Sequence, residues 1–308
     1  MNELLTRKEC NVFKGSHFVP WIIRGNPMEE KRRKKERHEN RKQCEKVVVF
    51  DLDETLGCFG DLYIIWCGLK HVFPHFDRFN DLLDLYPEFL RHGMLTILEY
   101  LYNTKLSREC SKLYMYTNNQ CSPLWVQMIS HYLQHKIAST NLCLFDQLIY
   151  AFKIQNKIVE LGRSSHNKSC DDFFKCTLLP CDTEICFIDD TIHPRMKNSR
   201  VYYICPKPYV HSLSKREIIS RLVRATTQWY PLANDTLMNT TIFWSNWFAI
   251  HKRRLSRETN PLEMDLQISQ KLIHHLREFI LFGRTKKKGT RKKKLRVIYS
   301  ITYKRRLP

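Results

Sequence analysis

The sequence predicts an α/β protein in which helices flank a mostly parallel central sheet. Short apolar runs alternate along the chain with segments whose apolar residues recur at helical spacing, a pattern typical of repeated βαβ units. The first run, residues 46–50 (KVVVF), is apolar without alternation, which indicates a strand buried on both faces. Hydrophobic residues make up 43% of the 308 residues, enough for a substantial core and too many for a wholly disordered chain.

Each predicted element follows from such a local pattern. Strands are expected where apolar or β-branched residues run together, at 46–50, 112–116, 147–152, 185–188 and 201–205. Helices are expected where apolar residues recur every three or four positions, at 94–104, 123–137, 168–178, 214–227 and 265–282. Residues 57–88 are aromatic-rich and irregular, and we expect a small insertion there, a loop or small hairpin rather than a full lid domain.

Charge divides the chain into regions. The net charge is +20, and residues 284–308 alone hold twelve Lys/Arg and no Asp/Glu, so the centre of the chain is nearly neutral. We expect four parts: a basic N-terminal extension at 1–45, a core at 46–210, a helical C-terminal region at 211–283 and a disordered basic tail at 284–308. The basic clusters at 31–35 and 286–294 suit nuclear-targeting signals or nucleic-acid contacts, and equally a solvated tail.

The twelve cysteines are interpreted as reduced thiols. The N-terminal sequence MNELLTRKEC lacks the apolar stretch of a secretion signal, and no run of 18 apolar residues occurs, so we expect an intracellular protein, nuclear or cytoplasmic, without membrane contact. Four cysteines lie five or six positions apart without a CxxC pair, which favours buried free thiols over a zinc site: Cys170, Cys176, Cys181 and Cys186.

Polar residues follow three of the predicted strands directly. These residues are Asp51 and Asp53, Thr117 and Asn118, and Asp189 and Asp190. In open parallel sheets ligands bind beyond the carboxyl ends of the strands, so the three groups are expected to converge on one crevice. Four carboxylates in one crevice repel each other unless a cation is bound, and oxygen ligands alone favour a hard ion, with Mg²⁺ the usual choice.

The spacing of the first pair suggests a reaction. Side chains two positions apart in an extended segment point to the same side, so Asp51 and Asp53 can face one substrate. One carboxylate can attack a phosphorus atom while the other handles the proton of the leaving group. A metal ion and a lysine would supply the positive charge that the phosphoryl oxygens require.

Taken together, VVVFDLDETLG, LYMYTNN, a downstream lysine and ICFIDDT resemble the four motifs of the haloacid dehalogenase-like (HAD) superfamily of phosphatases. The DLDETL form and Arg91-His92-Gly93 narrow the resemblance to the NLI-interacting-factor-like branch, which acts on the C-terminal domain of RNA polymerase II, although members typically have proline where this chain has His92. The resemblance covers about residues 46–210 and implies a Rossmann-like HAD fold. The style of the tail is similar to that of proteins from large DNA viruses.

The resemblance implies a role for each matching residue in the first two motifs. Asp51 matches the nucleophile that forms an aspartyl-phosphate, and it is also expected to bind the metal. Asp53 matches the general acid/base, and its backbone carbonyl would be a metal ligand. Thr117 matches the hydroxyl that binds the phosphoryl oxygen. Thr55, which closes the first motif and would steady its loop, and Asn118 are expected on the substrate side.

The last two motifs supply the remaining expectations. Asp189 and Asp190 match the residues that ligate Mg²⁺, and Lys168 is the preferred third-motif lysine, with Lys175 as its rival. Two nearby histidines, His166 and His193, are interpreted as surface or core residues.

The expected function is that of a Mg²⁺-dependent phosphatase that hydrolyses phosphomonoesters through an aspartyl-phosphate. A small insertion leaves the site open, which suits a large substrate, and a phosphoserine or phosphothreonine protein is the leading expectation. The alternatives are a phosphatase of nucleic acid ends or nucleotides, with the basic tails holding the polyanion, and a non-catalytic interaction protein on the same fold. The intact Asp51/Asp53 pair argues against loss of activity.

Overall fold

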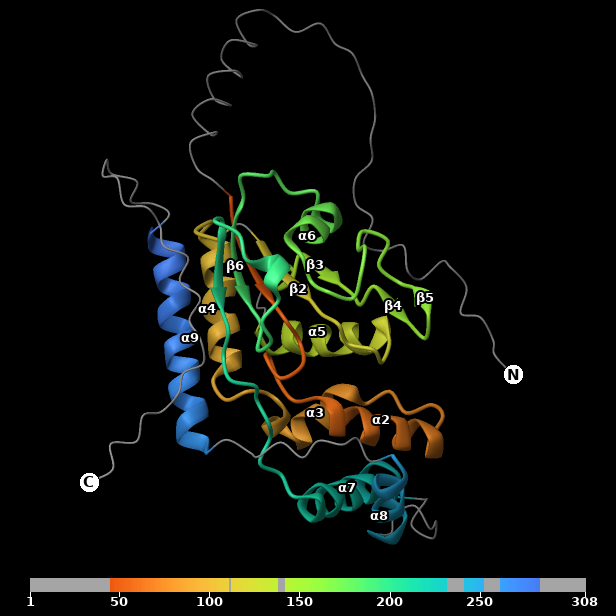
Figure 1. The fold of residues 1–308 in the computed structure, drawn as a ribbon. Coiled ribbons are helices and arrows are strands. Elements are labelled where there is room, and N and C mark those ends of the chain that lie inside the picture. The colour runs from red at the N-terminus through yellow and green to blue at the C-terminus, as the bar shows by residue number, and fades with distance from the viewer. Residues whose placement is uncertain (1–44, 111, 138–141, 232–240, 252–260, 283–308) are drawn as a thin grey trace, which may run out of the picture. The chain divides into compact units, whose positions relative to one another are not determined.

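The computed structural model describes residues 45–110, 112–137, 142–231, 241–251 and 261–282. Its centre is a five-stranded parallel sheet, which confirms the predicted α/β fold and its Rossmann-like arrangement (Figure 1). The strand order is β3-β2-β1-β6-β7. The strands are β1 (Lys46–Phe50), β2 (Lys112–Tyr116), β3 (Gln147–Ile149), β6 (Glu184–Ile188) and β7 (Val201–Ile204). The order reverses at β1, so the crevice of such a sheet lies at the carboxyl ends of β1 and its two neighbours.

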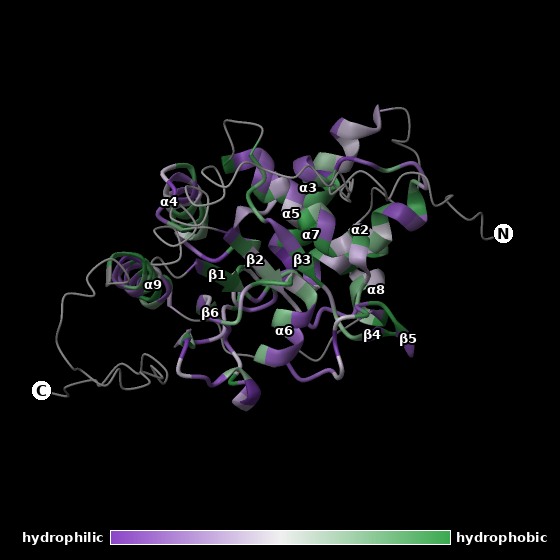
Figure 2. Cartoon of the chain, turned by 90° about the horizontal axis from the view of Figure 1, so that it is seen from above, coloured by the Kyte–Doolittle hydropathy of each residue, from purple (hydrophilic) through white to green (hydrophobic). Residues whose placement is uncertain are grey.

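Alternating side chains of the strands build two separate cores. Val48 and Phe50 of β1 belong to a large cluster on one face, and Val47 and Val49 belong to a smaller cluster on the other. All four residues are fully buried, so the prediction of a strand covered on both faces is confirmed. In Figure 2, which views the chain from above, β1 is largely green, the colour of hydrophobic residues.

The predicted helices are present with small changes at their ends. They are α4 (Met94–Leu106), α5 (Pro123–Ile137), α6 (Cys170–Thr177), α7 (Lys215–Trp229) and α9 (Leu262–Phe282). A further helix, α8 (Thr241–Ile250), lies in the C-terminal region, whose described residues contain α7, α8 and α9. Among these helices α6 packs on the smaller cluster, whereas the others contribute to the larger one.

Residues 57–88 differ from their prediction. They form the helices α2 (Gly60–Val72) and α3 (Phe79–Leu85), followed by the short 3₁₀ helix η2 (Pro87–Phe89), so the expectation of a loop or small hairpin is wrong. Leu62, Ile65 and Leu69 recur at helical spacing within this segment, and all three are fully buried in the large cluster. The many aromatic residues around them obscured that period.

An antiparallel hairpin was not predicted. The strand expected at 147–152 ends early, at Ile149, and the chain then forms the two short strands β4 (Lys153–Ile154) and β5 (Lys157–Ile158). Gln155 and Asn156 between them have positive φ angles of 48° and 63°, as a tight two-residue hairpin turn requires. This hairpin is a small insertion beside the parallel sheet.

The C-terminal helix α9 lies against α4 and the edge strand β7, as Figure 1 shows. Its last turn is held by Lys46 at the start of β1, whose ammonium donates to the carbonyls of Phe279 (3.0 Å) and Ile280. A cation at a helix C-terminus satisfies carbonyls that have no partner within the helix. This contact joins the two ends of the described chain.

The structure describes little of the predicted terminal extensions, and it describes most of the cysteines. The basic tail at 284–308 and all but the last residue of the N-terminal extension lie outside the described residues. Within the described ranges, every cysteine is a free thiol, and the helices include none that is long and apolar enough to cross a membrane.

Candidate active site

The predicted site residues begin where three neighbouring strands end. Asp51 follows β1, Thr117 follows β2 and Asp189 follows β6. Each donates its backbone N–H to the last residue of the adjacent strand, at 2.9, 3.0 and 3.2 Å respectively. Their main chains are thus still fixed by the sheet, while their side chains are free to point into the crevice beyond it.

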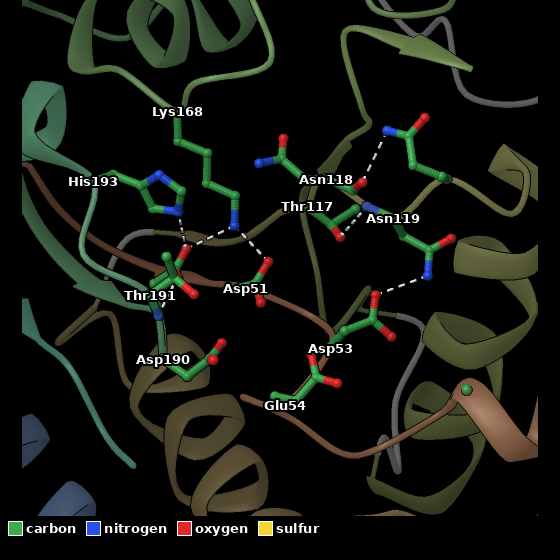
Figure 3. A pocket seen from close by; sticks show the side chains of 13 residues that line it. Asp51, Asp53, Glu54, Thr117, Asn118, Asn119, Lys168, Asp190, Thr191 and His193 are labelled. Atoms are coloured by element: carbon green, nitrogen blue, oxygen red, sulfur yellow. Dashed lines mark hydrogen bonds and ion pairs between the residues drawn. The ribbon is translucent and has the colours of Figure 1, made fainter. Parts of the chain in front are cut away.

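These side chains line a pocket of about 360 Å³, drawn in Figure 3. Its walls are formed by Asp51, Asp53, Glu54, Gly60, Thr117, Asn118, Asn119, Gln120, Lys168, Asp189, Asp190, Thr191 and His193. Of the residues predicted for the site, only Thr55 and the rival Lys175 do not line it.

Lys168 lies at the centre of the arrangement. Its ammonium contacts the Oδ1 atom of Asp51 and lies 2.7 Å from the Oδ2 atom of Asp189, and the residue is 1% exposed (Figure 3). It is placed there by the start of α6, because the next residue, Ser169, caps that helix by accepting a hydrogen bond from the N–H of Asp172 at 3.1 Å. Lys175 is exposed on the last turn of α6.

Burial and neighbouring charges shift the pKa values of Asp51, Asp189 and Lys168. Burial raises the pKa of the Asp51 carboxyl well above its ordinary value, and the nearby Asp189 adds to this, while Lys168 opposes it. Burial alone would also raise the pKa of Asp189, but Lys168 and His193 lower it below its ordinary value. The two carboxylates raise the pKa of Lys168 although its burial acts in the opposite direction. Lys168 is therefore charged, and the charged form of Asp51 depends on positive charge beside it.

Three carboxylates could hold a metal ion. Oxygen atoms of Asp51, Asp189 and Asp190 all lie within 4.8 Å of one another. Carboxylates are the donors that hard divalent cations prefer, and an ion among them would reduce their mutual repulsion. The side chain of Asp53 is not part of this group, and the expectation that its backbone carbonyl binds the metal stays a prediction.

Thr55 contacts Asp190, one of the three carboxylates that could hold a metal ion. Its hydroxyl lies 3.2 Å from Oδ1 of Asp190 as donor and accepts the N–H of Asp190 at 3.0 Å. Thr55 is fully buried, so its contacts are with Asp190 rather than with a substrate in the pocket.

Asn119 is a site residue that sequence reasoning missed. Its side-chain Nδ2 donates to Oδ2 of Asp53 at 2.8 Å, and its backbone N–H donates to the hydroxyl of Thr117 at 3.0 Å (Figure 3). The N–H of Cys121 donates to its Oδ1 atom at 2.9 Å, which orients the amide so that Nδ2 faces Asp53. The paired Asn-Asn after the strand was the available signal, but only Asn118 was singled out.

Arg163 was also missed, because no motif contains it. This buried arginine donates to the side chain of Asn118 at 2.7 Å and to the carbonyls of Thr117 (3.0 Å), Tyr150 (2.8 Å) and His166 (2.9 Å). It thereby fastens the loop after β2 to the loop that leads to Lys168.

The two histidines have different positions. His193 is half-buried and lines the pocket, with its Nε2 3.3 Å from Oδ2 of Asp189, and its interpretation as a non-catalytic residue stays a prediction. His166 is exposed and does not line the pocket.

Comparisons of the chain with protein-family models, with curated proteins and with solved structures give no match. What the site can do is therefore argued from its own residues.

The carboxylate group leads to a prediction about cation binding. A divalent cation that binds only the folded state should raise the free energy of unfolding by about 2.7 kcal/mol at 100 times its dissociation constant. Thermal unfolding with increasing Mg²⁺ should show this as a rising midpoint. Asp190→Asn removes one of the three carboxylates and should weaken the rise strongly. The exposed Asp182→Asn is the matched control and should respond as the wild type does. An equal rise in Asp190→Asn and Asp182→Asn would contradict the proposed ligands.

Proposed function

We propose that the chain is a Mg²⁺-dependent phosphatase that hydrolyses phosphomonoesters through a phosphoryl group carried transiently by Asp51. The observation that carries the proposal is the contact of the buried Lys168 with both Asp51 and Asp189, beside a third carboxylate and next to Asp53. A nucleophilic carboxylate, a fixed cation for the phosphoryl oxygens and a second carboxylate for proton transfer are the groups that this reaction needs. The proposal agrees with the resemblance of the four motifs to HAD phosphatases.

The reaction would proceed in two steps. A carboxylate oxygen of Asp51 attacks phosphorus, the bond from phosphorus to the ester oxygen breaks, and Asp53 gives its proton to the departing oxygen. A water molecule then attacks the phosphorus atom of the group on Asp51, and Asp53 takes the proton of that water. The bond from phosphorus to the Asp51 oxygen breaks, which releases phosphate and restores the Asp51 carboxylate. Asn119, at 2.8 Å from Asp53, would keep the proton-transferring carboxylate in place during both steps.

The remaining residues would bind the phosphoryl oxygens. Lys168 offers a charged donor that costs no reorganisation, because it is already fixed between two carboxylates. Thr117, with its hydroxyl, and Asn118, with its amide, also line the pocket (Figure 3). Held by Asp51, Asp189, Asp190 and the backbone carbonyl of Asp53, Mg²⁺ would supply the further positive charge that a phosphoryl dianion requires.

The charge of the pocket wall favours a phosphoprotein over a nucleic acid. The lining includes five carboxylates, Glu54 among them, and a single lysine, together with the uncharged Asn118, Asn119 and Gln120, of which Gln120 is exposed. The phosphates that flank the target in a nucleic acid would be repelled by Glu54, whereas amide side chains can hydrogen-bond a peptide backbone. We therefore infer that the substrate is a phosphoserine or phosphothreonine in a protein segment.

Turnover should depend on Lys168 and not on its rival. Lys168→Met should lower the rate of aryl phosphate hydrolysis by about 10²–10³-fold, because it removes one fixed charge from the reacting centre. Lys175→Met, an exposed lysine of the same loop–helix segment, should leave the rate unchanged. Both are compared at saturating Mg²⁺ with circular dichroism as the check on folding, and a chelator should abolish the activity of both. A normal rate in Lys168→Met would contradict the assignment.

The substrate class is tested by measuring the hydrolysis of different phosphomonoesters at physiological salt concentration. A phosphoserine peptide should be hydrolysed at least about tenfold more efficiently, by kcat/KM, than a single-stranded oligonucleotide with a terminal phosphate, a ratio that corresponds to about 1.4 kcal/mol of transition-state binding. The reverse order would support the nucleic-acid alternative. Binding of the peptide without hydrolysis of any substrate would support a non-catalytic interaction protein.

A further inference from the structure

The helix α9 carries two polar residues on its buried side. Ile268, Leu272 and Leu276 form an apolar stripe that packs into the large core. Asp265, one turn before Ile268, and Ser269, directly after it, lie on the same side of α9 and are 1% and 6% exposed. A buried carboxylate is costly unless an opposite charge accompanies it, so a helix that served only to cover the core would have an apolar residue at position 265.

The opposite charge is that of Arg91, at the turn before α4. Its Nη1 lies 3.9 Å from Oδ1 of Asp265, and both side chains are buried. Among the described residues this Nη1 has no hydrogen-bond partner, so Asp265 is the carboxylate that compensates that side of the guanidinium. Burial lowers the pKa of Arg91 to about 10, against the effect of Asp265, and the residue is therefore charged at neutral pH.

The other nitrogens of Arg91 reach the Asp51 loop, residues 51–57. Its Nε donates to the carbonyl of Thr55 at 2.8 Å, and its Nη2 donates to the carbonyl of Glu54 at 2.6 Å. Glu54 has a φ angle of 57°, a left-handed conformation that is unfavourable for a residue other than glycine and needs support from its surroundings. Arg91 provides that support at the residue itself and at the next one.

Ser269 holds the same turn from one helical turn further along α9. Its hydroxyl donates to the carbonyl of His92. Gly93 follows with a φ angle of 74°, and a Cβ atom there would lie 3.1 Å from the Cβ of Ser269, so α9 packs closely on the turn. The backbone of the turn is in addition paired with the Asp51 loop, since Arg91 donates its N–H to the carbonyl of Leu56 at 3.0 Å.

A continuous set of contacts therefore leads from α9 to the metal-capable carboxylates. Asp265 pairs with Arg91, Arg91 holds the carbonyl of Thr55, and the hydroxyl of Thr55 contacts Asp190. We propose that Asp265, in the C-terminal helix and far in sequence from every motif, is a positioning residue that fixes the Asp51 loop through Arg91. The effect on turnover rests on the proposed function, whereas the effect on the loop does not.

The test compares the full-length chain with Asp265→Asn, which keeps the size of the side chain and removes its charge. Backbone hydrogen exchange in residues 51–58 should become about tenfold faster, and the dissociation constant for Mg²⁺, measured by calorimetry, should rise about tenfold. In an aryl phosphate assay kcat should fall more than KM changes, because the loop carries the reacting groups.

The control is Tyr202→Phe, which removes the contacts of a β7 hydroxyl with His275 (3.0 Å) and Glu278 (3.3 Å) elsewhere on α9. It should leave exchange in residues 51–58 unchanged.

Exchange that accelerates in α9 but not in residues 51–58 of Asp265→Asn would overturn the proposal. If Asp265→Asn does not fold, Arg91→Lys decides, since it keeps a charge beside Asp265 but removes donors to the carbonyls of Glu54 and Thr55 and should speed exchange in the loop, whereas no change there would overturn the proposal. If the wild type neither binds Mg²⁺ nor hydrolyses phosphate, the proposed function fails, and the exchange measurement still decides the role of Asp265.

Discussion

The contact of Lys168 with Asp51 and Asp189 is the interaction on which the rest of the site depends. Burial disfavours the charged form of both carboxylates, and two such groups at adjacent strand ends also repel each other. One fixed ammonium between them offsets both effects, and an ion at Asp51, Asp189 and Asp190 would act in the same sense. A buried cluster of this kind destabilises a fold when it is incomplete, and strongly shifted pKa values gather at functional sites, which agrees with the proposed function.

Two buried arginines hydrogen-bond the loops that carry Lys168, Thr117 and Asp51, and they form a frame around the site. Arg163 joins the loops that carry Thr117 and Lys168, and Arg91 joins the Asp51 loop to the turn before α4. Both act mainly on backbone carbonyls, for which a planar guanidinium with several donors is well suited. The side chains of the pocket can therefore be held closely in place although they stand on loops. In this account the C-terminal helix α9 belongs to the frame, because Asp265 compensates the charge of Arg91.

Local pattern was sufficient to predict the strands, most helices and the residues at the strand ends. An unbroken apolar run followed by Asp51 or Asp189 carries its information within a few residues, and parallel topology then brings the strand ends together. Asn119 and Arg163 could not be found in this way, because their contacts join different loops. His193 contacts Asp189 four positions earlier, but a single histidine at that spacing belongs to no motif. Residues 57–88 were mistaken for a loop because dense aromatic residues hid the spacing of Leu62 and Ile65, and the β4–β5 hairpin was too short to leave a pattern.

If Asp51 carries the phosphoryl group, the phosphorylated chain can be isolated. The chain is mixed with an aryl phosphate and Mg²⁺, quenched in acid, digested and analysed by mass spectrometry. One phosphoryl group is expected on the peptide that contains Asp51. More of that form is expected in Asp53→Asn, because an aryl leaving group needs little protonation whereas the attacking water needs a base. Turnover that persists in Asp51→Asn, with no phosphoryl group on that peptide in the wild type, would rule out Asp51 as the nucleophile.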